Sequence, residues 1–266
     1  MLPVYRDFFL IEGGISTART WRQQWRLAEI CRELGFDTEA QDLYRAAAVD
    51  SQASGSCRIA AALYCNTQGD YATATELFQL EQKLDRDNPV AYQAYALMLK
   101  EQGRFEEAEV QFQQGLQADP TNGPTYQAYA LMLKEQGRFE EAEVQFQQGL
   151  QADPTSGPTY QAYALMLKEQ GRFEEARPLL EHTIRLQPYD VRYRIQWLNL
   201  VFYGLDAVDE ANAVVKDLLP RDDITGSLRK HLRDTANLID WRQSLLAGDA
   251  EAKHNVQRRS QYTTGS

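Results

Sequence analysis

Residues 92–120 read YQAYALMLKEQGRFEEAEVQFQQGLQADP, and residues 126–154 repeat all 29 of them without a change. Residues 160–176 repeat the first 17 once more, so each copy begins 34 residues after the one before it. A fixed period of this length indicates stacked structural repeats, in which each unit buries its apolar face against its neighbours.

Each copy carries the apolar pattern of two consecutive helices. The first helix has bulky and small apolar residues at helical spacing: Tyr92, Tyr95, Ala96 and Leu99. Gly103 follows, a residue that readily takes the positive φ needed where a helix stops and turns. The second helix continues the pattern with Phe105, Ala108, Phe112 and Leu116, and Asp119-Pro120 ends it. The sequence therefore predicts an antiparallel helix pair in every copy.

These residues resemble the tetratricopeptide repeat (TPR). The pattern Tyr92-x2-Tyr95-Ala96-x2-Leu99, then Ala108-x3-Phe112, then Pro120 matches the family apart from two positions. Tyr95 stands where Leu is usual, and Gly115 stands where Ala is usual. The resemblance implies an all-α fold, a right-handed superhelix of about six helix pairs closed by a C-terminal capping helix. It also implies a protein-binding scaffold whose first helices line a concave groove.

The 34-residue frame extends in both directions from the copies. It gives a superhelix over residues 17–224 with six units: 21–54, 55–88, 89–122, 123–156, 157–190 and 191–224. The last unit contains a one-residue insertion. Residues 225–257 are expected to form capping helices, with Thr225 or Ser227 as the first cap, and 258–266 a disordered tail. The apolar leader, 1–16, is interpreted either as a lid over the first pair or as an arm for docking or self-association.

Composition narrows the classes of function. The net charge of −10 argues against a nucleic-acid ligand, and no apolar run is long enough to span a membrane. Cys31 and Cys65 occupy the core position of Leu99, and the histidines lie far from the cysteines, so we expect reduced thiols, no metal site and a cytoplasmic protein.

The face of each first helix that points away from its partner helix is the predicted groove. In the copies it presents a glutamine, a leucine and a lysine in each repeat. A peptide backbone can bond the amides, and the leucines offer apolar area, unless each leucine is covered by a neighbouring helix. The full set of predicted groove residues is Arg22, Trp25, Arg26, Glu29, Ile59, Leu63, Gln93, Leu97, Lys100, Gln127, Leu131, Lys134, Gln161, Leu165, Lys168 and Asn199.

The first unit has a different groove face. Arg22, Arg26 and an exposed Trp25 would suit an acidic peptide or a carboxylate. The alternative is that the arginines are solvated and pair with carboxylates such as Glu29 on the same helix.

Nothing in the sequence predicts catalysis. It holds no nucleophile motif and no phosphate-binding glycine loop, and Glu106, Glu107 and Glu109 recur on an outer helix face near Arg104. We therefore expect a non-catalytic adaptor without a cofactor, which binds a protein or peptide partner in the groove. The alternatives are a self-associating assembly protein and, by analogy alone, a bacterial chaperone of secretion or pilus assembly.

Overall fold

The computed structural model describes residues 20–224 and 226–246. They fold into α-helices and one π-helix without a strand, which confirms the predicted all-α repeat fold. The chain divides into two compact units, Met1–Pro154 (unit 1) and Thr155–Ser266 (unit 2). Each unit is described by itself.

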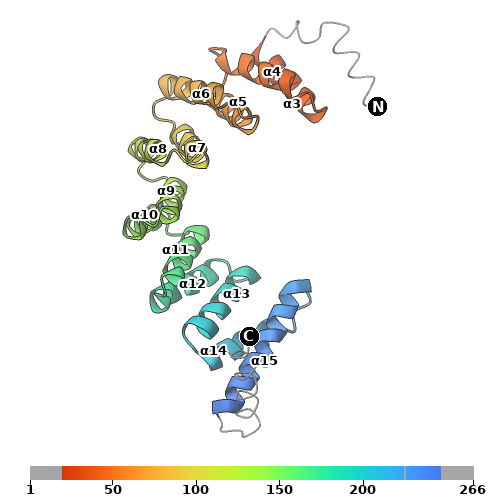
Figure 1. The fold of residues 1–266 in the computed structure, drawn as a ribbon, viewed down its shortest axis with the longest axis vertical. Helices are drawn as coiled ribbons and strands as arrows, with labels where there is room; N and C mark the ends of the chain where they lie inside the picture. The colour runs from red at the N-terminus through yellow and green to blue at the C-terminus, as the bar shows by residue number, and fades with distance from the viewer. Residues whose placement is uncertain (1–19, 225, 247–266) are drawn as a thin grey trace, which may run out of the picture. The chain divides into compact units, whose positions relative to one another are not determined.

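Unit 1 consists of consecutive helix pairs: α3 (Trp21–Glu33) with α4 (Asp37–Val49), α5 (Gly55–Thr67) with α6 (Tyr71–Leu84), α7 (Pro89–Glu101) with α8 (Phe105–Ala118), and α9 (Gly123–Glu135) with α10 (Phe139–Ala152). Each first helix packs against its own second helix, and α5, α7 and α9 also contact one another in sequence. Figure 1 shows α5, α7 and α9 on one side of this unit and α6, α8 and α10 on the other.

Local sequence signals set the ends of these helices. Asn122 accepts a hydrogen bond from the backbone N–H of Thr125 through its side chain, at 3.0 Å, and thereby caps α9. Gly137 follows α9 with a φ of +74°, the value also found at the predicted turn residue Gly103. Asn88 occupies the cap position of α7, but its side chain donates to Oε1 of Glu81 at 2.8 Å and does not cap the helix.

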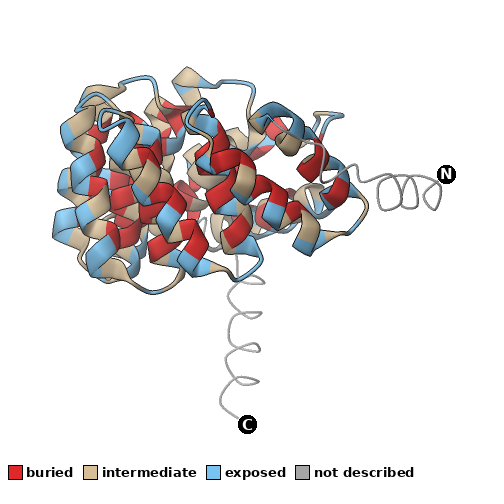
Figure 2. Ribbon diagram, turned by 90° about the horizontal axis from the view of Figure 1, so that it is seen from above, coloured by how far each residue is buried: buried red, intermediate tan, exposed pale blue. Residues whose placement is uncertain are grey.

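Aromatic rings join neighbouring pairs in the core of unit 1. Phe78 of α6 stacks on Tyr95 of α7 with centroids 5.1 Å apart, and Phe112 of α8 stacks on Tyr129 of α9 at 5.4 Å. Tyrosine at this repeat position therefore supplies a stacking partner for the preceding helix pair. Gly115 serves close packing, because a Cβ there would lie 3.0 Å from Cβ of Tyr92. Figure 2 shows the buried residues on the helix faces that meet.

The cysteines are core residues. Cys31, Cys57 and Cys65 are all buried and free, which confirms the prediction for Cys31 and Cys65. Burial away from water disfavours the thiolate and raises the pKa of Cys57 and that of Cys65 to about 11.

Unit 2 contains α11 (Gly157–Glu169), α12 (Phe173–Leu186), α13 (Val191–Asn199), the π-helix η1 (Leu200–Gly204), α14 (Val208–Leu218) and α15 (Gly226–Leu246). The predicted one-residue insertion lies in η1, where Leu205 donates its N–H to the carbonyl of Leu200 at 3.0 Å. This i to i−5 bond accommodates one extra residue in a helix.

Helix α15 packs against α14 and completes the core of unit 2. Its residues Leu232 and Ile239 are buried in a cluster with Leu198 of α13 and Val215 of α14. None of the described helices is both long enough and apolar enough to cross a membrane. The leader 1–16, the cap residue Thr225 and the tail 258–266 lie outside the described residues.

Candidate peptide-binding groove

The central residues of the predicted groove lie on α7 and α9. Leu97 and Leu131 occupy the same repeat position, are both partly exposed, and belong to helices in direct contact. Their spacing from Gln93 and Lys100, at i−4 and i+3, puts all three residue types on one face of the helix. Unit 1 therefore keeps a row of accessible leucines on its first-helix side.

Polar bonds between repeats border this row. Nζ of Lys100 lies 2.7 Å from Oε1 of Glu135, one repeat further on, and the lysine side chain is only 23% exposed. Gln127 and Lys134 also have partners within the chain. The lysines were expected to be available to a ligand, but Lys100 is paired with Glu135 and links α7 to α9.

Two predicted groove residues of the first pair make contacts within unit 1. Trp25 is partly buried, because its ring lies 4.7 Å from that of Tyr44 and packs on the cluster of Ala47, Ala53 and Cys57. Glu29 accepts a hydrogen bond from the Tyr44 hydroxyl and pairs with Arg32 at 2.6 Å. Burial, and then the bond to Glu29, raise the pKa of Tyr44. The expectation of an exposed Trp25 was therefore wrong.

The remaining predicted residues of unit 1 differ in exposure. Arg22 and Arg26 are exposed, and Arg22 lies over the ring of Trp21, with Cζ 5.2 Å from the centroid. On α5, Leu63 is exposed, whereas Ile59 is buried. A ligand could reach the two arginines and Leu63, but only the edge of Ile59.

The first helix of unit 2, α11, carries the same glutamine, leucine and lysine positions. Gln161, Leu165 and Lys168 of α11 are each partly exposed. Asn199, at the end of α13, is bound by the C-terminal helix, because Oδ1 lies 3.0 Å from Nε2 of His231. Its side-chain oxygen is therefore engaged within unit 2.

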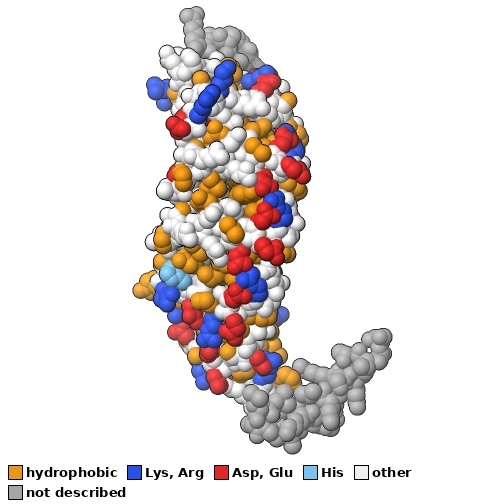
Figure 3. Space-filling view, turned by 90° about the vertical axis from the view of Figure 1, so that its left-hand side faces the viewer, with side chains coloured by type: hydrophobic (Ala, Val, Ile, Leu, Met, Phe, Trp, Pro, Cys, Tyr) orange, Lys and Arg blue, Asp and Glu red, His pale blue; other side chains and the backbone are white. Residues whose placement is uncertain are grey.

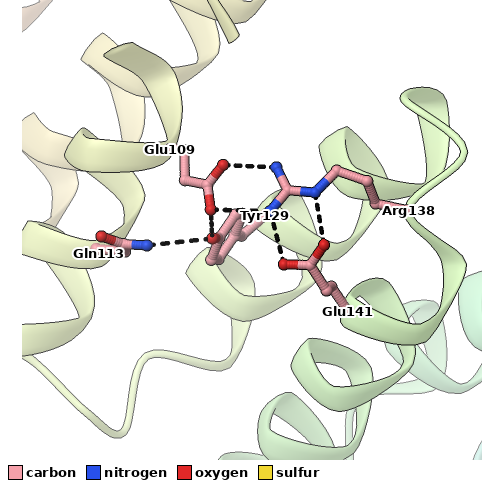
Figure 4. Close-up of polar contacts among 5 residues, drawn as sticks. All are labelled: Glu109, Gln113, Tyr129, Arg138 and Glu141. Atoms are coloured by element: carbon pink, nitrogen blue, oxygen red, sulfur yellow. Dashed lines mark hydrogen bonds and ion pairs between the residues drawn. The ribbon is translucent and has the colours of Figure 1, made fainter. Parts of the chain in front are cut away.

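A polar cluster between α8, α9 and α10 was missed in the sequence. Tyr129 donates its hydroxyl to Oε1 of Glu109 at 2.6 Å, and Arg138 bonds Glu109 and Glu141 at 2.6 Å each (Figure 4). The bond from Arg138, and then that from Tyr129, lower the pKa of Glu109. Burial, followed by the bond to Glu109, raises the pKa of Tyr129 to about 12.

The cluster connects neighbouring repeats, and every carboxylate oxygen shown in it faces a donor. Figure 3 shows the face of unit 1 formed by its second helices, where charged side chains gather mainly along one edge and uncharged ones cover the rest. Groups of three or more potential metal ligands do not occur in the described part of the chain.

Comparisons with known proteins agree with this architecture. Two sequence models described as tetratricopeptide repeat match residues 89–132 and 133–195. No curated protein sequence matches the chain.

Solved structures show the same fold at low sequence identity. The pilF protein of Pseudomonas aeruginosa has a TM-score of 0.54 at 17% identity, over 92% of this chain and 99% of that one. A tetratricopeptide repeat protein from Parabacteroides merdae scores 0.55 at 15%, over 87% and 88% of the two chains. MamA from Desulfovibrio magneticus RS-1 scores 0.51 at 16%, over 64% and 96%. The stacked helix pairs and the two family matches lead to one assignment: residues 89–195 of the chain are tetratricopeptide repeats.

Proposed function

We propose that unit 1 binds an extended or helical peptide segment of a partner protein against the face of α3, α5, α7 and α9. At the level of the family, tetratricopeptide repeats are protein-interaction scaffolds and are generally non-catalytic. The observation that carries the finer proposal is the pair Leu97 and Leu131, which stays partly exposed at equivalent positions on adjoining helices.

The energetics favour apolar anchoring. Covering the open parts of two leucines removes apolar area from water at about 25 cal/mol per Å². Because Leu97 and Leu131 lie on packed helices that contact each other, they need little ordering when a ligand arrives. In unit 2, Leu165 offers the same kind of contact.

The same proposal makes the protein a cytoplasmic adaptor that performs no chemistry and binds no nucleic acid. A cytoplasmic location is supported by the three buried, free thiols, since disulfides are rare where glutathione keeps cysteines reduced. Support against nucleic acid comes from the net charge of −10, because phosphate backbones are repelled by an acidic surface.

The test selects peptides on the wild-type full chain from a displayed library and measures their affinity by fluorescence anisotropy. The variant is L97E/L131E, and the matched control is V110E/V144E, which changes exposed valines on the second helices of the same two repeats. We expect the leucine variant to lose about tenfold or more in affinity and the valine variant to keep it.

Equal binding by both variants would show that the peptide lies elsewhere. Sedimentation of the same samples tests the alternative of self-association. In that case the wild-type protein alone would form oligomers, and the L97E/L131E variant would be monomeric.

A further inference from the structure

An open surface cavity of about 420 Å³ lies in unit 2, between α12, α13 and α14. Its apolar lining consists of Ile184 of α12, Trp197 of α13, and Ala213 and Val214 of α14. The volume falls in the range of small-ligand and side-chain pockets. None of its lining residues belongs to the predicted groove set.

The cavity lies where unit 2 departs from the repeated sequence. By the repeat frame, with the insertion counted, Val214 stands at the position of Gln145, and Asp217 at that of Gln148. Glu181 likewise stands at the position of Gln113. Neutral glutamines in the copies are thus replaced by an apolar residue in the wall and by carboxylates at the rim.

The rim has excess negative charge. Glu181 and Glu210 share Arg177, with N–O distances of 3.1 and 2.7 Å, and Asp217 pairs with Arg194. Three carboxylates therefore face two guanidinium groups. The three acidic side chains are 41%, 41% and 57% exposed, so a cationic partner can approach them.

The wall also contains an unused donor. Nε1 of Trp197 is buried and has no hydrogen-bond partner in the described part of the chain. A buried indole N–H is usually bonded, so this unmatched donor marks the wall as incompletely packed.

We propose that this cavity docks a basic amphipathic peptide of a partner protein. One apolar side chain of the peptide fills the space beside Trp197, and lysine or arginine side chains pair with Glu181, Glu210 and Asp217. The choice of a cationic partner rests on the excess of carboxylates at the rim. This surface is additional to the leucine row, and either can fail without the other.

The experiment measures fluorescence anisotropy of a labelled peptide of about twelve residues, built from Lys and Ala around one Phe, with the full-length protein at low salt. Companion peptides replace the Phe by Ala or every Lys by Glu. A213W fills the cavity from an exposed position of α14, and D217K reverses one rim charge. D234K makes the same charge change on an exposed part of α15 and is the matched control.

We expect saturable binding of the Lys–Phe peptide by the wild type and by D234K. Affinity should fall about tenfold with A213W and about fivefold with D217K, and both companion peptides should bind weakly. Thermal melts of each variant report folding, and if A213W fails to fold, D217K alone decides the question.

Three outcomes overturn the proposal: no saturable binding, unchanged affinity in both cavity variants, or tight binding that appears only in the full-length K253E/R258E/R259E variant. The last outcome would assign the cavity to the chain's own basic C-terminal residues rather than to a partner.

Discussion

The hydroxyl of Tyr129 lies 2.6 Å from Oε1 of Glu109, while the ring of the same tyrosine stacks on Phe112. One side chain of α9 thus makes an apolar and a polar contact with the preceding helix α8. The polar contact is absent from the otherwise equivalent position one repeat earlier, because Thr75 occupies the place that corresponds to Glu109. Two identical sequence copies therefore differ in how they are joined to the helix before them.

Tyr129→Phe removes the hydroxyl and keeps the stacked ring. We expect a loss of about 0.5–1.5 kcal/mol in the free energy of unfolding, the usual net value of one hydrogen bond. The measurement is urea denaturation followed by circular dichroism. Tyr95→Phe is the control, since Tyr95 has the same sequence neighbours and stacks on Phe78 but faces no carboxylate at the position of Thr75. Equal losses in both variants would contradict this assignment of the hydroxyl.

Glu109→Gln tests the pH dependence of the cluster. The native pKa of Glu109 is lowered, chiefly by Arg138, so the ionised form stabilises the folded state. That stabilisation is complete above the unfolded value of about 4.3 and is lost as the pH falls through the lower native pKa. We expect the wild type to exceed the variant in urea midpoint at pH 7, and the difference to shrink below pH 4.

The control for that series is Glu106→Gln, which removes an exposed carboxylate from the same helix. Its midpoint should follow that of the wild type across the pH range. A wild-type advantage over Glu109→Gln that persists unchanged at pH 3 would show that the amide fails for steric reasons rather than through its charge.

Local signals in the sequence predicted the helix pairs well. Gly103, Pro120 and the apolar spacing act within a few residues of themselves, so the repeat could be assigned from one copy. Contacts across repeats could not be predicted in the same way. Trp25 packs beside Tyr44 rather than in the groove, and Lys100 pairs with a residue 35 positions away. Such partners depend on how neighbouring pairs meet, which the period alone does not determine.

The buried ion pair of Arg58 and Glu81 is a second test of packing in unit 1. Nε of Arg58 lies 2.6 Å from Oε2 of Glu81, with side chains 7% and 1% exposed. Glu81→Leu leaves a buried guanidinium without its counter-charge, and we expect a loss of about 3–5 kcal/mol. The double variant R58M/E81L removes both charges and should recover most of that loss. If the double variant is as unstable as the single one, the pair contributes through shape and not through charge.

Asp206 permits a test of backbone strain in unit 2. It has a φ of +54°, at the turn position where the preceding repeats have glycine, and it pairs with Arg242 of α15. Replacing Asp206 by Gly removes a left-handed conformation that costs an ordinary residue about 1–2 kcal/mol, and gives up an exposed ion pair that contributes about 0–1 kcal/mol. We therefore expect Asp206→Gly to be neutral or stabilising by up to about 1 kcal/mol in urea denaturation.

Two further variants separate the contribution of backbone strain from that of the ion pair with Arg242. Gly171→Ala imposes the same strain at the preceding turn, where a Cβ meets nothing within 4 Å, so its loss of about 1–2 kcal/mol is conformational alone. Asp206→Asn keeps a residue tolerant of this conformation and removes the charge. Both Asp206→Gly and Asp206→Asn lack the charge, and both are compatible with the conformation of the turn. If both lower the free energy of unfolding by more than about 1 kcal/mol, Asp206 stabilises the protein through its ion pair with Arg242 and not through the turn.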